Sequence, residues 1–123
     1  MRDIAVVVNN KNKNVSIIDT IDAIKKAGFK NVFIQWYNNK EWYPPQEQQL
    51  KYIREKDLNV IFAHLGYQNI NNIWLENEEG NRLVDSYKND IRICRENNIP
   101  MVIMHLAGKN DAPKYNKLGL ERL

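Results

Sequence analysis

Short apolar runs alternate with longer amphipathic stretches along this chain. The apolar runs are rich in β-branched residues and bounded by polar turn residues, which predicts buried strands. Between them, apolar residues recur at helical spacing, first as Ile17, Ile21 and Ile24. Ser16 is a candidate N-cap for this helix, and Gly28 fits its C-terminal stop. The runs that predict strands are residues 4–8, 31–37, 59–64 and 100–105.

Two further helices follow from the same spacing. Pro44 and Pro45 suit the first turn of the second helix, which directs Leu50 and Ile53 inward. A long loop over residues 65–80 then precedes a third helix, and residues 116–123 predict the start of a fourth. The apolar face expected for the third helix consists of Leu83, Val84, Tyr87, Ile91 and Cys94.

The resulting β-α-β-α-β-α-β order predicts an α/β fold with a parallel sheet. Either a doubly wound open sheet or part of a barrel satisfies this order. No glycine-rich phosphate turn follows the first strand, and the distinctive residues follow the third and fourth strands, as barrel chemistry requires. We therefore expect a parallel (βα)4 half of a TIM barrel, with strand order 1-2-3-4 and helices on the outer face.

Composition narrows the class of protein. With 123 residues, 43% hydrophobic and 27% charged, the chain fits one soluble domain spanning residues 1–123. Its single cysteine and the absence of a long apolar run favour a cytoplasmic protein with no membrane association. The net charge of +3 is spread along the sequence rather than clustered, so we do not expect a nucleic-acid partner.

Both histidines of the chain end predicted strands. His64 closes "VIFAH", His105 closes "MVIMH", and a glycine turn follows each. Adjacent parallel strands lie about 4.8 Å apart, so two imidazoles in this position could share one metal ion or hold one substrate. A histidine that ends a single strand is more often a packing or rim residue. Its recurrence in successive repeats favours a functional pair.

Other side chains near the same strand ends are candidates for substrate binding. Trp36, Tyr67 and Trp74 could stack on a sugar ring, although packing in long loops explains them equally well. Lys109 could contact a phosphate, with a solvated loop lysine as the alternative. Cys94 lies on an apolar helix face and is expected in the core rather than as a nucleophile.

The chain resembles the N-terminal half of the sugar phosphate isomerase/epimerase family, the xylose isomerase-like TIM barrels whose superfamily includes endonuclease IV-like enzymes. The stretches that carry the resemblance are "DTIDAIKKAGFKNVFIQWY", "VIFAHLGYQNINNIW" and "IPMVIMHLAGKNDAP". This resemblance implies metal-assisted proton transfer on a sugar or sugar phosphate. It also implies a divalent metal, Zn or Mn, near His64 and His105, which match the strand-three and strand-four histidines of the family.

The resemblance covers only the first four strands of the family's barrel. A whole barrel has eight strands, and in this family the catalytic acids come from strands five to eight, so no catalytic residue is assigned here. We expect a truncated product, an expressed fragment or one half of a split barrel, and the activity of the chain alone is an open question. The alternatives are an endonuclease IV-like, zinc-dependent DNA-repair relative and a non-catalytic half-barrel fragment.

A four-stranded half barrel would leave two strand edges and one sheet face uncovered. An exposed apolar face of this kind drives association, so we expect a homo-oligomer unless a C-terminal half completes the barrel. The candidates for the uncovered face are Val6, Val8, Ile34, Ile61 and Ile103.

Overall fold

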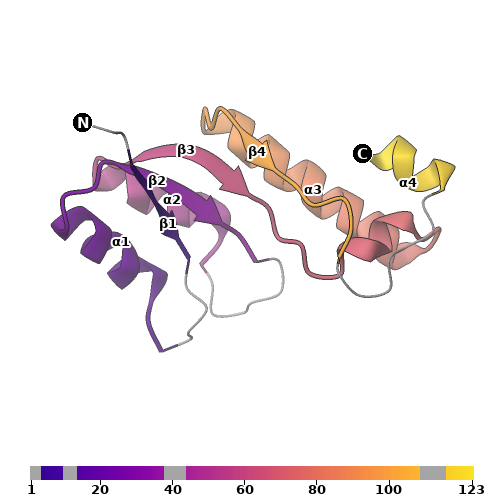
Figure 1. Cartoon of the computed structure of the whole chain (residues 1–123), viewed down its shortest axis with the longest axis horizontal. Helices are drawn as coiled ribbons and strands as arrows, with labels where there is room; N and C mark the ends of the chain where they lie inside the picture. Colours follow the sequence, from indigo (N-terminus) through magenta and orange to yellow (C-terminus); the bar gives the residue numbers. More distant parts are fainter. Residues whose placement is uncertain (1–3, 10–13, 38–43, 109–115) are drawn as a thin grey trace.

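A computed structural model of the chain describes residues 4–9, 14–37, 44–108 and 116–123. Its four strands form one all-parallel sheet in the order β1-β2-β3-β4 (Figure 1). This confirms the predicted α/β class and is consistent with a (βα)4 half barrel. The elements in chain order are β1 (Ala5–Val8), α1 (Ile17–Lys26), β2 (Asn31–Gln35), α2 (Gln46–Glu55), β3 (Asn59–His64), the 3-10 helix η1 (Ile70–Trp74), α3 (Glu78–Glu96), β4 (Val102–Ile103) and α4 (Lys117–Arg122).

The predicted start of the first helix is confirmed by its hydrogen bonding. The Asp19 backbone N–H donates to Ser16 Oγ at 3.0 Å, which satisfies one of the free donors at the N-terminus of α1. The apolar stripe of Ile17, Ile21 and Ile24 is buried as expected. Gly28, just beyond the helix, has a φ of 85°, a backbone conformation that a side chain would strain.

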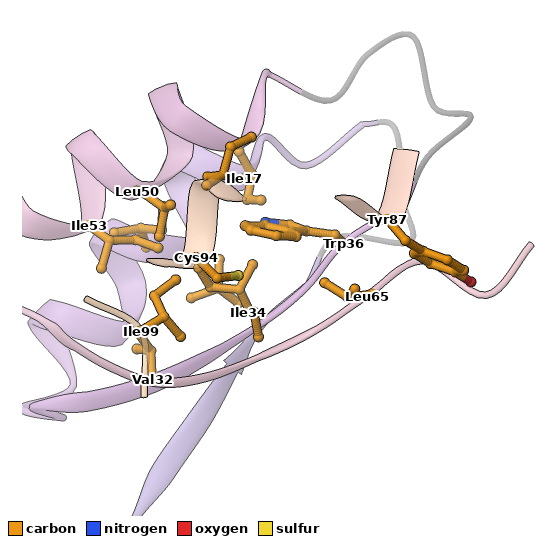
Figure 2. Close-up of a cluster of buried hydrophobic side chains, with 14 of the residues drawn as sticks. Ile17, Val32, Ile34, Trp36, Leu50, Ile53, Leu65, Tyr87, Cys94 and Ile99 are labelled. Atoms are coloured by element: carbon orange, nitrogen blue, oxygen red, sulfur yellow. The ribbon is translucent and has the colours of Figure 1, made fainter. Parts of the chain in front are cut away.

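The helices α1, α2 and α3 all cover the same face of the sheet. Their buried side chains join those of the strands in one continuous core. Figure 2 shows Val32, Ile34 and Trp36 on the same side of the ribbon as Leu50 and Cys94 of the helices. The predicted placement of helices on a single face is therefore confirmed for these three.

The opposite face of the sheet carries no helix among the described residues. Its side chains come from the alternate strand positions, and Val7, Phe33 and Phe62 stand opposite one another in the register. We call Val7, Phe33, Phe62 and Ile103 the open face. Phe33 and Phe62 stack with ring centroids 4.5 Å apart, and Ile103 is 37% exposed.

The expected composition of this face was wrong at three positions. Val8 and Ile34 are fully buried on the helix side, and Val6 also packs against the core. Ile103 does lie on the open face. Ile61 sits at an irregularity where β3 inserts one residue between the partners of Val32 and Phe33. Alternation within a fully apolar run does not reveal which set of residues meets the helices.

Several element boundaries differ from the prediction. Pro45 is the N-cap of α2, so the proline pair precedes the helix rather than forming its first turn. The expected loop contains η1, and α3 starts two residues before that loop was expected to end. Ile91, expected on the buried face of α3, is 47% exposed, and β4 contains only two residues.

The fourth helix packs on the loop after β3 instead of on the sheet. Gly119 lies against the indole of Trp74 so closely that a Cβ at this position would overlap the ring. The guanidinium of Arg122 donates to the carbonyl oxygens of Ile73 and Leu75, both at 2.8 Å. In the described part of the chain, no helix is both long and apolar enough to cross a membrane.

Candidate functional site

His64 and His105 meet at the carboxyl end of the sheet. Their Nε2 atoms are 3.1 Å apart, and their ring centroids are separated by 5.0 Å. His64 is half-buried, whereas His105 is exposed. The predicted proximity of the two imidazoles is confirmed, and their function stays a prediction.

Backbone pairing between β3 and β4 brings the two rings together. The Ala63 N–H donates to Met101 O at 3.0 Å, and the Leu65 N–H donates to Ile103 O at 2.9 Å. His64 is the register partner of Ile103, so His105 lies two positions beyond that partner. His105 lies beyond the end of β4, and the contact of its ring with that of His64 places it on the side of Ile103, which is the open face.

Two further groups contact the other nitrogen of His64. Gln35 Nε2 lies 2.9 Å from His64 Nδ1, and the carbonyl oxygen of Leu65 lies 3.1 Å from the same atom. Gln35 ends β2 and is the register partner of His64, so both side chains project from the open face. Sequence reasoning assigned no role to Gln35. Its position two residues after Phe33 is the signal that places it on that face.

Tyr67 completes the surface around the histidines. Its ring centroid lies 4.7 Å from that of His105 and 5.8 Å from that of His64. The side chain is 41% exposed, so one face of this cluster is open to solvent. An exposed aromatic ring beside two imidazoles can stack on the apolar face of a ligand while the ring nitrogens meet its polar atoms.

Trp36 and Trp74, two other predicted substrate-binding residues, are not brought to this cluster. Trp36 is 1% exposed within the core beneath the helices, and Trp74 is 3% exposed in η1. Trp74 Nε1 donates to the carbonyl oxygen of Leu106 at 3.0 Å, which ties the loop after β3 to the chain after β4. Lys109 lies outside the described residues.

The histidine pair fits part of a divalent metal site. Two imidazole nitrogens bound to one tetrahedral Zn at about 2.0–2.1 Å each are roughly 3.3 Å apart, close to the separation in the pair. Within residues 4–9, 14–37, 44–108 and 116–123, no group of three or more His, Cys, Asp or Glu side chains is placed to hold a metal ion. The described chain therefore provides two nitrogen ligands without a carboxylate.

A second polar cluster lies away from the histidines, between α2 and α3. Asp90 is 1% exposed, and its Oδ1 accepts a hydrogen bond from Gln46 Nε2 at 3.0 Å. Burial raises the pKa of Asp90 to about 6, although the bond from Gln46 opposes this shift. Its Oδ2 has no protein partner in the described residues. This carboxyl is a buried structural group rather than a ligand aimed at the open face.

Cys94 and Tyr87 flank Asp90 on the same helix. Burial, with a smaller contribution from the charge of Asp90, raises the pKa of the Cys94 thiol to about 11 and that of Tyr87 to about 12. Cys94 is buried as expected, and a thiol with so high a pKa is a poor nucleophile. The Tyr87 hydroxyl donates to Gly66 O at 2.9 Å and so holds the turn between His64 and Tyr67 against α3.

The comparisons with known proteins do not assign this chain to a family. Neither the protein-family models nor the curated proteins that were searched contain a match to this chain.

Proposed function

We propose that this chain forms half of a sugar phosphate isomerase/epimerase-like active site, which assists proton transfer on a sugar or sugar phosphate with a divalent metal. The observation that carries the proposal is the 3.1 Å separation of the His64 and His105 Nε2 atoms at the carboxyl end of a parallel sheet. This end of the strands is where barrels of this class build their sites.

The histidines and Tyr67 would bind different parts of the ligand complex, the metal ion and the sugar. His64 and His105 would hold Zn or Mn through Nε2, since neutral imidazole suits both ions. When bound, such an ion polarises a carbonyl or hydroxyl oxygen and stabilises the negative charge that develops as a carbon-bound proton leaves. Tyr67, exposed beside both rings, would stack on the sugar and orient it.

The second half of the site would come from a further four-stranded unit that covers the open face. The edge strands β1 and β4 contain only Ala, Val and Ile, so neither has a charged side chain to oppose pairing with another strand. Eight strands close a barrel of this type, and two units of four provide them. In a preparation of this chain alone the second unit would be another copy. In a longer protein it would be a C-terminal half.

The reducing cytoplasm is the compartment that we propose for this protein. The only cysteine of the sequence is buried at 1% exposure, and neither its position nor its raised pKa suits a disulfide partner outside the chain.

The DNA-repair alternative has less support. A DNA-binding surface uses Arg and Lys to meet phosphates, and the stretch 68–79 after His64 contains neither. Five of the twelve residues there are Asn or Gln, whose amides can form hydrogen bonds with sugar hydroxyls. A non-catalytic half-barrel fragment is the other alternative, and it predicts no ligand at the histidine pair.

Isothermal titration calorimetry with Zn²⁺ and Mn²⁺ tests the proposal. The wild-type chain should bind at least one of these ions, and His64→Ala and His105→Ala should each weaken binding by about tenfold or more. Gln68→Ala, just beyond Tyr67, is the matched control and should bind like the wild type. Deuterium uptake from D₂O into the carbon-bound positions of a sugar phosphate then tests proton transfer.

The competing assignments give different results. Metal binding that is unaffected by both histidine substitutions would overturn the proposed site. Cleavage of abasic-site DNA without exchange into a sugar phosphate would favour the DNA-repair alternative. A folded chain that binds neither metal nor sugar phosphate would favour the non-catalytic fragment.

A further inference from the structure

Gln35 contacts Nδ1 of His64, the ring nitrogen that does not face His105. Its Nε2 lies 2.9 Å from His64 Nδ1 and 3.3 Å from the carbonyl oxygen of Trp36. The carbonyl oxygen can only accept a hydrogen bond, so the NH₂ end of the amide, rather than its oxygen, belongs on that side. With the amide in this orientation, Gln35 donates and His64 Nδ1 accepts.

The carbonyl oxygen of Leu65 favours the opposite arrangement. It lies 3.1 Å from His64 Nδ1 and can form a hydrogen bond only if that nitrogen carries a proton. A neutral imidazole has one N–H, so Gln35 and Leu65 compete for the tautomer of His64. The Gln35 contact is the shorter of the two, and it keeps the second amide hydrogen on Trp36 O.

Whether Nδ1 of His64 carries the proton determines whether Nε2 is a hydrogen-bond donor or a metal ligand. If Nδ1 accepts from Gln35, Nε2 carries the proton and donates to His105 Nε2, 3.1 Å away. If Nδ1 donates to Leu65, His64 Nε2 presents a lone pair, which is the form that binds a metal. The two tautomers therefore correspond to a hydrogen-bond donor and a ligand at the same atom.

We propose that Gln35 is a positioning residue that holds His64 in its Nε2–H form, so that the free pair is joined by a His64-to-His105 hydrogen bond. Metal entry then requires the proton to move from Nε2 to Nδ1, where the carbonyl oxygen of Leu65 accepts it and the hydrogen bond from Gln35 is lost. The second statement rests on the proposed function, because it concerns metal at the same pair. The first does not depend on it.

Nitrogen NMR of the imidazole rings tests the tautomer directly. In the ¹⁵N-labelled, metal-free chain at a pH where the rings are neutral, long-range ¹H–¹⁵N spectra should show His64 Nε2 protonated and Nδ1 unprotonated. Gln35→Met, which keeps the length and removes the donor, should reverse this pattern in favour of Leu65. Gln35→Glu should also reverse it, since a carboxylate accepts from Nδ1–H. Gln48→Glu, an exposed change on α2, should leave the spectra unchanged.

Zinc affinity gives a second readout on the same variants. Gln35→Glu should bind Zn²⁺ about tenfold more tightly than the wild type, because its carboxylate stabilises the ligand form of His64. Protonated Nδ1 in the wild type, or the same tautomer in the wild type and Gln35→Met, would overturn the inference. A tautomer change without Zn²⁺ binding by any variant would support the inference and contradict the metal-holding part of the proposed function.

Discussion

The two faces of the sheet are made from the same strands but differ in what they contact. On the helix side, Val8, Ile34 and Ala63 stand side by side in the register and are each 0% exposed. On the open face, the neighbouring row of Val7, Phe33 and Phe62 remains partly exposed. A shift of one residue along a strand therefore separates a fully packed position from one that still faces solvent.

The difference between the two faces of the sheet shows where the candidate functional side chains lie. Gln35 and His64, which end β2 and β3, and His105, two residues beyond β4, all lie on the open face. On the helix side, the register positions next to theirs are occupied by Ile34 and Ala63, which only pack. Packing stabilises the sheet from one side, and the other side is the one on which we propose that a ligand and a further protein unit bind.

The largest expected effect comes from a matched pair of substitutions in β2. Ile34→Ala should lower the free energy of unfolding by about 4 kcal/mol, because it leaves a cavity in a close-packed core. Phe33→Ala, at the adjacent residue, should cost only about 1–2 kcal/mol, mostly from the lost stack with Phe62. Urea denaturation followed by circular dichroism measures both. Equal costs would contradict the assignment of the two faces.

The pH dependence of stability that Asp90 causes measures how completely the helix side of the sheet excludes water. Its native pKa of about 6 exceeds the ordinary 3.8, so the folded chain keeps this proton over a pH range in which the unfolded chain has lost it. The free energy of unfolding should therefore fall as pH rises from 3.8 to 6. Asp90→Asn should remove most of this decline and raise the free energy of unfolding at pH 8 by about 2 kcal/mol.

Asp85→Asn is the control for this measurement, because Asp85 is an exposed carboxylate on the same helix. It should preserve the decline between pH 3.8 and 6. A pH profile that is identical in the wild type and Asp90→Asn would show that Asp90 is solvated in the native state.

The smallest effect on stability, and the most direct on assembly, is expected from a charge on the open face. Phe62→Glu should change the free energy of unfolding by about 1 kcal/mol, because the ring is already partly exposed. It should also convert a wild-type dimer to a monomer in size-exclusion chromatography with light scattering, since the charge cannot be buried unpaired. Ile91→Glu, on the exposed side of α3, should remain a dimer.

A monomeric wild-type chain across the accessible concentration range would contradict self-association through the open face. A dimer that Ile91→Glu disrupts and Phe62→Glu preserves would place the interface on the helix layer instead.

Local sequence signals predicted much of the helical layer. Ser16 caps α1 and Ile17, Ile21 and Ile24 are buried because capping and helical spacing act within a few residues. The same reasoning failed for Ile91, which is exposed because the buried side of α3 in this region is formed by Tyr87, Asp90, Ile93 and Cys94. It also missed η1, which packs against α3 and α4 and follows no extended helical spacing of its own.

The sequence by itself determined the order of strands and main helices, the parallel topology and the placement of His64 at the end of β3, whereas His105 lies two residues beyond β4. These follow from periodicity and from the handed, short connections that such a chain permits. Only the tertiary structure decided which face each strand residue occupies, that Gln35 reaches His64, and that Trp36 and Trp74 pack inside. Those facts depend on register, on an inserted residue in β3 and on long-range packing, which no local pattern encodes.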